Sequence, residues 1–89
     1  MSFKYDFSDD LIRIFKKLMK KDKQLYENVK NKINEVANNS DIEHYKNLRY
    51  DLKEYKRVHI GSFVLIFKFD NVNQIIHFES FKHHDKIYE

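Results

Sequence analysis

The stretch "YKRVHIGSFVLIFKFD", residues 55–70, predicts two adjacent β-strands joined by a tight turn. In the first strand, alternation places Arg57 and His59 on one face, and Val58 and Ile60 on the other. In the second strand, four bulky apolar side chains share one face: Phe63, Leu65, Phe67 and Phe69. The other face of that strand receives Val64, Ile66 and Lys68. We therefore expect a small sheet with one apolar face and one face that carries cationic and titratable groups.

Two amphipathic helices are predicted upstream of these strands. Ser8 can cap the first helix, whose apolar residues recur at i, i+3, i+4 and i+7: Leu11, Ile14, Phe15 and Leu18. Asp22 can cap the second helix, which ends at Asn38–Asn39 and has the apolar stripe Leu25, Tyr26, Val29, Ile33 and Val36. The alternation of Phe3, Tyr5 and Phe7 predicts a short strand before the first helix.

The remaining segments complete the predicted order of elements. Residues 40–43 have capping-box spacing and can begin one more helical turn. Strands 57–60, 63–70 and 74–81 are closely spaced, so they predict an antiparallel meander. In the last strand Ile76 and Phe78 should face inward, whereas Ile75 and Phe81 do not fit the alternation. The sequence predicts an α+β fold of order β-α-α-β-β-β, with an N-terminal helical hairpin on one face of a small antiparallel sheet.

Length and composition exclude several classes of function. A chain of 89 residues is expected to form one domain, residues 1–89. It has no cysteine, one glycine and no proline, which excludes thiol chemistry, cysteine-based zinc sites and Gly-rich phosphate loops. No segment approaches the ~18 apolar residues of a membrane helix. The N-terminus also lacks the layout of a secretory signal, so a cytoplasmic location is expected.

Cations and imidazoles are the candidate reactive groups. They are Arg57, His59 and the adjacent Lys56, followed near the C-terminus by Lys82, His83, His84 and Tyr88. Imidazole exchanges protons near neutral pH, arginine holds phosphate oxygens, and aromatic rings stack on bases. These groups suit RNA cleavage without a metal or cofactor. Adjacent histidines on a strand point opposite ways, so no shared metal is expected at His83 and His84. From the residues alone, the pattern favours a basic α+β domain, and nucleic-acid binding is the function that it indicates.

A longer pattern adds a family resemblance. The run from Leu52 to Phe67, L-K-x-Y-x-R-V-x-I-G-x-F-x-L-I-F, resembles the strand–turn–strand signature of RelE-type toxins of the RelE/ParE superfamily. The C-terminal "IIHFESFKHHDKIYE" and the helical hairpin extend the resemblance over almost the whole chain. RelE-type members are toxins of type II toxin–antitoxin pairs that cleave mRNA in the ribosomal A site. The resemblance therefore implies an mRNA endoribonuclease that inhibits translation, with the ribosome and mRNA as partners and no membrane partner.

The resemblance also implies roles for particular residues. Arg57 and His59 match basic positions of the family, and Val64 stands where many members have an arginine. His84, or His83 if the register slips by one, matches the arginine after the last strand, and Tyr88 matches the stacking aromatic residue.

The resemblance also implies partners. A RelB-like antitoxin should wrap the toxin with an amphipathic helix or an added strand. Ribosomal RNA should be contacted by a lysine cluster: Lys16, Lys17, Lys20, Lys21 and Lys23. Two alternatives stay open. One is a non-enzymatic toxin of the same fold, either a gyrase inhibitor or a catalytically weakened relative, and the other is a basic nucleic-acid-binding domain.

Overall fold

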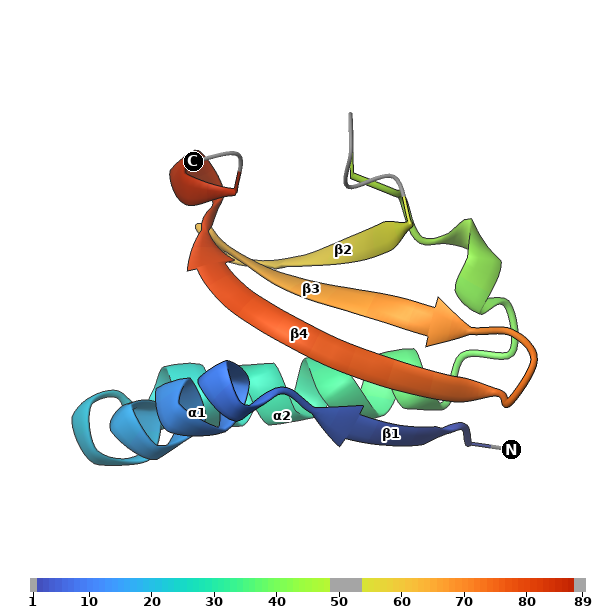
Figure 1. The fold of residues 1–89 in the computed structure, drawn as a ribbon. Coiled ribbons are helices and arrows are strands. Elements are labelled where there is room, and N and C mark those ends of the chain that lie inside the picture. Colours follow the sequence, from blue (N-terminus) through green and yellow to red (C-terminus); the bar gives the residue numbers. More distant parts are fainter. Residues whose placement is uncertain (1, 49–53, 88–89) are drawn as a thin grey trace.

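A computed structural model of the chain describes residues 2–48 and 54–87. Its longer elements are β1 (Lys4–Phe7), α1 (Asp9–Lys21), α2 (Lys23–Ala37), β2 (Tyr55–Ile60), β3 (Phe63–Asp70) and β4 (Ile75–His83). Two short 3₁₀ turns are η1 (Ile42–His44) and η3 (His84–Lys86). The order β-α-α-β-β-β is confirmed, and the helical hairpin lies on one face of the sheet (Figure 1). None of the helices in the described residues is long and apolar enough to cross a membrane.

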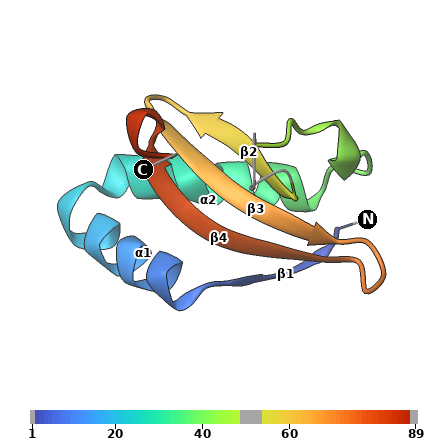
Figure 2. The same cartoon turned by 45° about the horizontal axis from the view of Figure 1, so that its top comes forward.

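The four-stranded sheet has the order β1-β4-β3-β2 (Figure 2). The predicted meander is confirmed, since β2, β3 and β4 pair in antiparallel fashion. The sheet as a whole is mixed rather than antiparallel, because β1 runs parallel to β4 at its edge. Both helices and two strands separate β1 from β4 along the chain, so no tight turn forces these strands to run in opposite directions.

The predicted helix caps hold the hairpin in place. Ser8 Oγ accepts from the N–H of Leu11 at 3.1 Å, while its hydroxyl donates to the carbonyl of Glu79 at 2.6 Å. This second bond ties the start of α1 to β4. Asp22 Oδ1 accepts from the N–H of Leu25 at 3.1 Å and so caps α2.

The core lies between the helices and the facing side of the sheet. It includes Leu11, Val29, Ile33, Val36, Leu65, Phe67, Ile76, Phe78 and Phe81. A β-bulge explains why Phe81 breaks the predicted alternation. Ile66 pairs with Ser80 and Phe67 pairs with Phe78, so Glu79 has no opposite residue. The extra residue reverses the alternation, and both Phe78 and Phe81 face the helices.

Residues 46–48, which lie between α2 and β2, cover part of one sheet edge. Among the described residues between α2 and β2, the only helical turn is η1. It begins one residue after the start that the capping-box spacing of residues 40–43 predicts, and no side chain caps it. The N–H of Leu48 then donates to the carbonyl of Tyr55 at 2.8 Å, and the N–H of Arg57 donates to Lys46 at 3.0 Å. β2 therefore begins at Tyr55, two residues before the predicted strand. Gly61, with a φ of +61°, allows the two-residue turn into β3.

Candidate functional site

The candidate site lies on the sheet face that points away from the helices. In the antiparallel register, His59 pairs with Val64, which pairs with Lys82, and Arg57 pairs with Ile66. Directly paired residues share a sheet face. The structure thus brings Arg57, His59 and Lys82 onto the same face, as alternation predicted for the first two.

Arg57 and His59 have side chains that are available to a ligand. Arg57 is half-buried and His59 is exposed. Among the described residues, neither side chain has a hydrogen-bond or ion-pair partner. A guanidinium group without a carboxylate partner can bind two oxygens of a phosphate through its planar fork.

The centre of this face is apolar and partly covered. Val64 and Ile66 form a second buried cluster with Leu48 and Ile87, and Tyr55 packs against it. The face is therefore only partly open to solvent. A hollow of about 210 Å³ remains, lined by Leu48, Tyr55, Ile66, Glu79, Ser80, Lys82 and Ile87. Both polar and apolar groups line this hollow, which suits a ligand with a charged and a flat apolar part.

Val64 has no exposed surface and supports the C-terminal segment. It lies in the same cluster as Ile87, which follows η3. An arginine at this position would place a guanidinium group beneath Ile87. Val64 thus has a structural role, the contact with Ile87, at a position where the resemblance implies an arginine.

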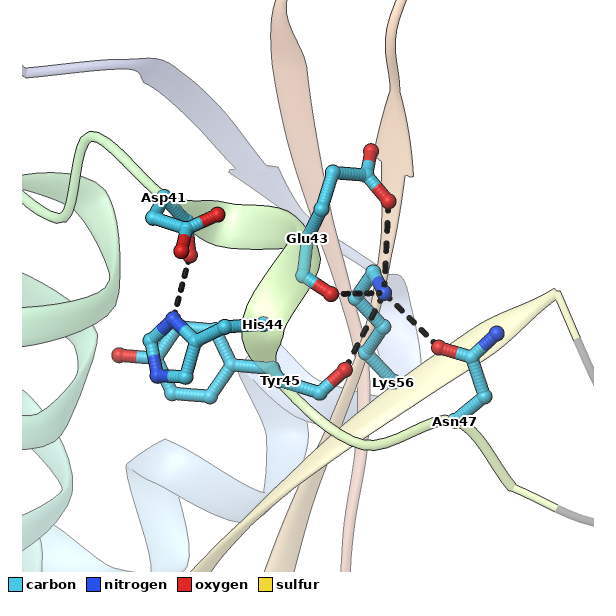
Figure 3. Close-up of polar contacts among 6 residues, drawn as sticks. All are labelled: Asp41, Glu43, His44, Tyr45, Asn47 and Lys56. Carbon is cyan, nitrogen blue, oxygen red and sulfur yellow. Dashed lines mark hydrogen bonds and ion pairs between the residues drawn. The ribbon is translucent and has the colours of Figure 1, made fainter.

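Lys56 does not belong to the candidate site, contrary to the sequence-based hypothesis. Its side chain is on the opposite face from Arg57 and is 7% exposed. Its Nζ donates to Asn47 Oδ1 at 2.8 Å, to the carbonyl of Tyr45 at 3.2 Å and to that of Glu43 at 3.4 Å (Figure 3). The Glu43 carboxylate lies 3.6 Å away. Lys56 therefore holds the segment after η1 against β2.

Lys82 connects the candidate site to helix α1. It is exposed, and it lines a second hollow with Ser80 on β4 and with Arg13 and Lys17 on α1. The predicted lysine cluster is exposed on α1 and at the first position of α2: Lys16, Lys17, Lys20, Lys21 and Lys23. In residues 2–48 and 54–87, none of these five forms an ion pair. Positive charge thus continues from the sheet face onto α1.

His83 and His84 lie close together at the end of β4. His83 is the last residue of the strand and His84 begins η3, so their rings are 4.6 Å apart. The expectation that they point in opposite directions is wrong, because the strand ends between them. The N–H of His84 donates to the carbonyl of Ser62 at 3.0 Å, which places His84 beside the β2–β3 turn. Tyr88 lies outside the described residues.

A further histidine on the candidate face was not singled out from the sequence. His77 pairs with Lys68 on β3, and its Nδ1 lies 2.7 Å from Asp6 Oδ1 on β1. The pair joins residues that are 71 positions apart. Only the parallel pairing of β1 with β4 brings them together, and that pairing was not predicted.

Asp70 has the only resolved pKa shift among the described groups. Its Oδ2 accepts from the side-chain amide of Asn73 at 2.8 Å, and its Oδ1 accepts from the N–H groups of Val72 and Asn73 at 3.0 Å each. The side-chain hydrogen bond from Asn73, and next its backbone N–H, lower the pKa of Asp70 because they favour the charged carboxylate. Asp70 therefore stabilises the turn between β3 and β4.

Comparisons with known proteins agree on one family. The family described as "ParE toxin of type II toxin-antitoxin system, parDE" matches residues 2–88. A Methanocaldococcus jannaschii protein, provisionally named toxin RelE4, is 41% identical over 88 residues, which cover 98% of this chain and 92% of that protein.

Solved structures show the same fold. One is the toxin–antitoxin complex RelBE2 of Mycobacterium tuberculosis, with a TM-score of 0.77, 15% identity, and coverage of 94% of this chain and 100% of that chain. Another is a mutant of the E. coli toxin RelE in the free state, with a TM-score of 0.76, 20% identity, and coverage of 99% and 90% respectively. With the sequence matches, these findings show that the chain belongs to the RelE/ParE family of type II toxin–antitoxin toxins and is of the RelE type.

Proposed function

We propose that this toxin is a ribosome-dependent endoribonuclease that cleaves mRNA in the A site and thereby inhibits translation. One observation carries the proposal: Arg57, His59 and Lys82 share a sheet face beside a hollow of about 210 Å³. These groups can bind a phosphate and exchange a proton. The chain is a RelE-type toxin, which supports mRNA as the proposed substrate.

The proposed reaction uses groups of the protein alone. His59 takes the proton of a ribose 2′-hydroxyl, and the 2′-oxygen attacks the adjacent phosphorus. Arg57 and Lys82 bind the non-bridging oxygens and stabilise the charge that develops there. The bond from phosphorus to the 5′-oxygen breaks, and His84 gives a proton to that oxygen. The products are a 2′,3′-cyclic phosphate and a 5′-hydroxyl end.

The surroundings of His84 suit a group that transfers protons. Its Nδ1 lies 2.9 Å from Asp85 Oδ1, and a carboxylate at this distance fixes the orientation of the ring. Its Nε2 then remains for the substrate. In this proposal Tyr88 stacks on an mRNA base, and His83 serves in place of His84 if the register of the family differs by one residue.

The proposed partners are the ribosome, mRNA and a cognate antitoxin in the cytoplasm. RelBE2 of M. tuberculosis is a toxin–antitoxin complex, which supports a RelB-like antitoxin for this chain. The antitoxin would wrap the toxin with an amphipathic helix or an added strand. Residues 46–48 already pair with the first half of β2. Within the described chain, the outer edge of β1 therefore offers the longer run of backbone for an added strand.

Primer extension on mRNA from a translating extract tests the proposal. Adding the toxin should create new 5′ ends within codons that occupy the A site. His59→Ala and His84→Ala should each slow single-turnover cleavage by at least about 10²-fold, as expected for the loss of an acid–base group. His44→Ala is the matched control, since His44 is an exposed histidine whose ring stacks on Tyr45 instead. Blocked translation without new ends would contradict the proposal.

A catalytically weakened or gyrase-inhibiting toxin is the second candidate function. The observation that favours it is the complete burial of Val64, where the resemblance implies an arginine. A supercoiling assay with purified gyrase separates the two functions. Inhibition of supercoiling, together with intact mRNA in the extract, would support this candidate.

A further inference from the structure

We propose that His83, His84 and Asp85 form a binding site for one divalent transition-metal ion, such as Zn²⁺ or Ni²⁺. The site lies where β4 ends and η3 begins. The proposal concerns metal binding and does not depend on RNA cleavage.

The donor set determines the class of metal. Two imidazole nitrogens and one carboxylate oxygen are the ligands that zinc, nickel and copper accept in proteins. Mg²⁺ and Ca²⁺ prefer oxygen ligands only, so we expect weak binding of both.

The three side chains already converge. One ligand atom from each residue can be chosen so that all three lie within 4.8 Å of one another. The two oxygens of Asp85 face different rings, with His84 Nδ1 at 2.9 Å from Oδ1 and His83 Nδ1 at 3.4 Å from Oδ2. Ligands about 2.0–2.1 Å from a tetrahedral metal lie roughly 3.3 Å apart. The donors therefore need to approach by about 1.5 Å at most, which rotation of the exposed His84 and Asp85 side chains allows.

The backbone keeps the three residues in this arrangement. The N–H of His84 donates to Ser62 in the β2–β3 turn at 3.0 Å. The N–H of Asp85 donates to His83 Nδ1 at 3.3 Å, which holds this ring beside the start of η3. A neutral imidazole is the form that binds a metal. His84 and Asp85 are exposed, so water can complete the coordination sphere.

The other histidines of the described chain lack such a set of three. His77 meets one carboxylate, that of Asp6. The Nδ1 of His44 faces the backbone carbonyl of Asp41, and its ring stacks on Tyr45. His77 is therefore a matched control, because it has a histidine–aspartate contact without a second imidazole.

Isothermal titration of the tag-free toxin with ZnCl₂ tests the site. We expect one Zn²⁺ per chain and much weaker binding of MgCl₂. His83→Gln, His84→Gln and Asp85→Asn should each weaken Zn²⁺ binding by at least about 10-fold, whereas His77→Gln should leave it unchanged. If the wild type binds no Zn²⁺, or if the three variants bind as well as the wild type, the proposal is wrong.

A second measurement locates the ion without a variant. In NMR spectra of the wild type, Zn²⁺ should shift the ring signals of His83 and His84 more than those of His44 and His77. Shifts confined to His44 or His77 would overturn the assignment.

Metal binding would also bear on the proposed function. An imidazole that binds a metal is neutral rather than an imidazolium, so it is a much weaker acid toward RNA, and Zn²⁺ should inhibit cleavage. This consequence rests on the proposed function. The titration does not, so a failure of either proposal can be recognised separately.

Discussion

Replacement of Lys56 by methionine should destabilise the fold without touching the candidate site. The methionine side chain fills a similar volume but has no hydrogen to donate. In the wild type, the Lys56 ammonium group is almost fully buried and donates to two backbone carbonyls and to Asn47 Oδ1. The substitution leaves all three acceptors without this donor.

The magnitude follows from the contacts that are lost. A buried polar group without a partner costs about 1–3 kcal/mol, and three are affected. Glu43 and Asn47 are exposed, so water can reach part of this segment and reduce the loss. Methionine also avoids the cost of burying a charge. We therefore expect a net destabilisation of about 2–4 kcal/mol. In a domain of this size, that lowers the melting temperature by at least about 8 °C.

Two variants serve as controls in urea unfolding followed by circular dichroism. Glu43→Gln should cost at most about 1 kcal/mol, because the carboxylate is 65% exposed and lies 3.6 Å from the ammonium. Arg57→Met makes the same kind of change on the opposite face, so it should impair cleavage and leave stability almost unchanged. If Lys56→Met unfolds like the wild type but loses cleavage, Lys56 belongs to the active face and our reasoning is refuted.

Two further predictions concern the turn at Asp70 and the lysines of the helical hairpin. Hydrogen bonds from Asn73 lower the pKa of folded Asp70 below its unfolded value near 3.8. The charged Asp70 carboxylate therefore stabilises the fold fully above pH 3.8, and this stabilisation is lost as the pH falls through the folded pKa. The difference in melting temperature between wild type and Asp70→Asn should therefore be full at pH 7 and shrink below about pH 4; a difference that does not depend on pH would contradict this. Replacing Lys16, Lys20 and Lys23 together by glutamine should raise the ribosome concentration needed for cleavage and weaken its salt dependence, while the single-turnover rate at saturation stays unchanged. A lower saturated rate would place these lysines at the reaction itself.

Much of the fold could be predicted because periodicity depends on local sequence. The alternation in β3 was confirmed residue by residue, and so were the caps at Ser8 and Asp22. In the sequence, the bulge at Glu79 appeared only as a break in the alternation at Phe81. The extra residue reverses which face the following side chains point to, but no particular residue type marks it. The parallel pairing of β1 with β4 depends on contacts between distant segments, which no local pattern contains.

The candidate site was only partly predictable. Alternation correctly placed Arg57 and His59 together. The same rule puts Lys56 on the face of Val58 and Ile60, yet a lysine is seldom expected inside a small protein. Its burial depends on carbonyl groups from residues 43–45, whose position the sequence does not reveal. The contact between His77 and Asp6 was not predicted either, because it requires the parallel pairing of β1 with β4.

Val64 stands where the resemblance implies an arginine, and its packing also bears on the position of His84, the proposed acid. Its side chain forms a buried cluster with Ile87, and Ile87 directly follows η3, the turn that contains His84. His84 is also held by Ser62, next to the strand that carries Val64. An arginine at position 64 would add a positive charge to the face, but it would remove the apolar contact on which Ile87 packs. At a position where the resemblance implies a cation, the chain thus has an apolar side chain that anchors its C-terminal segment. The resemblance implies an arginine where His84 follows the last strand, so in the proposed reaction an imidazole takes that position.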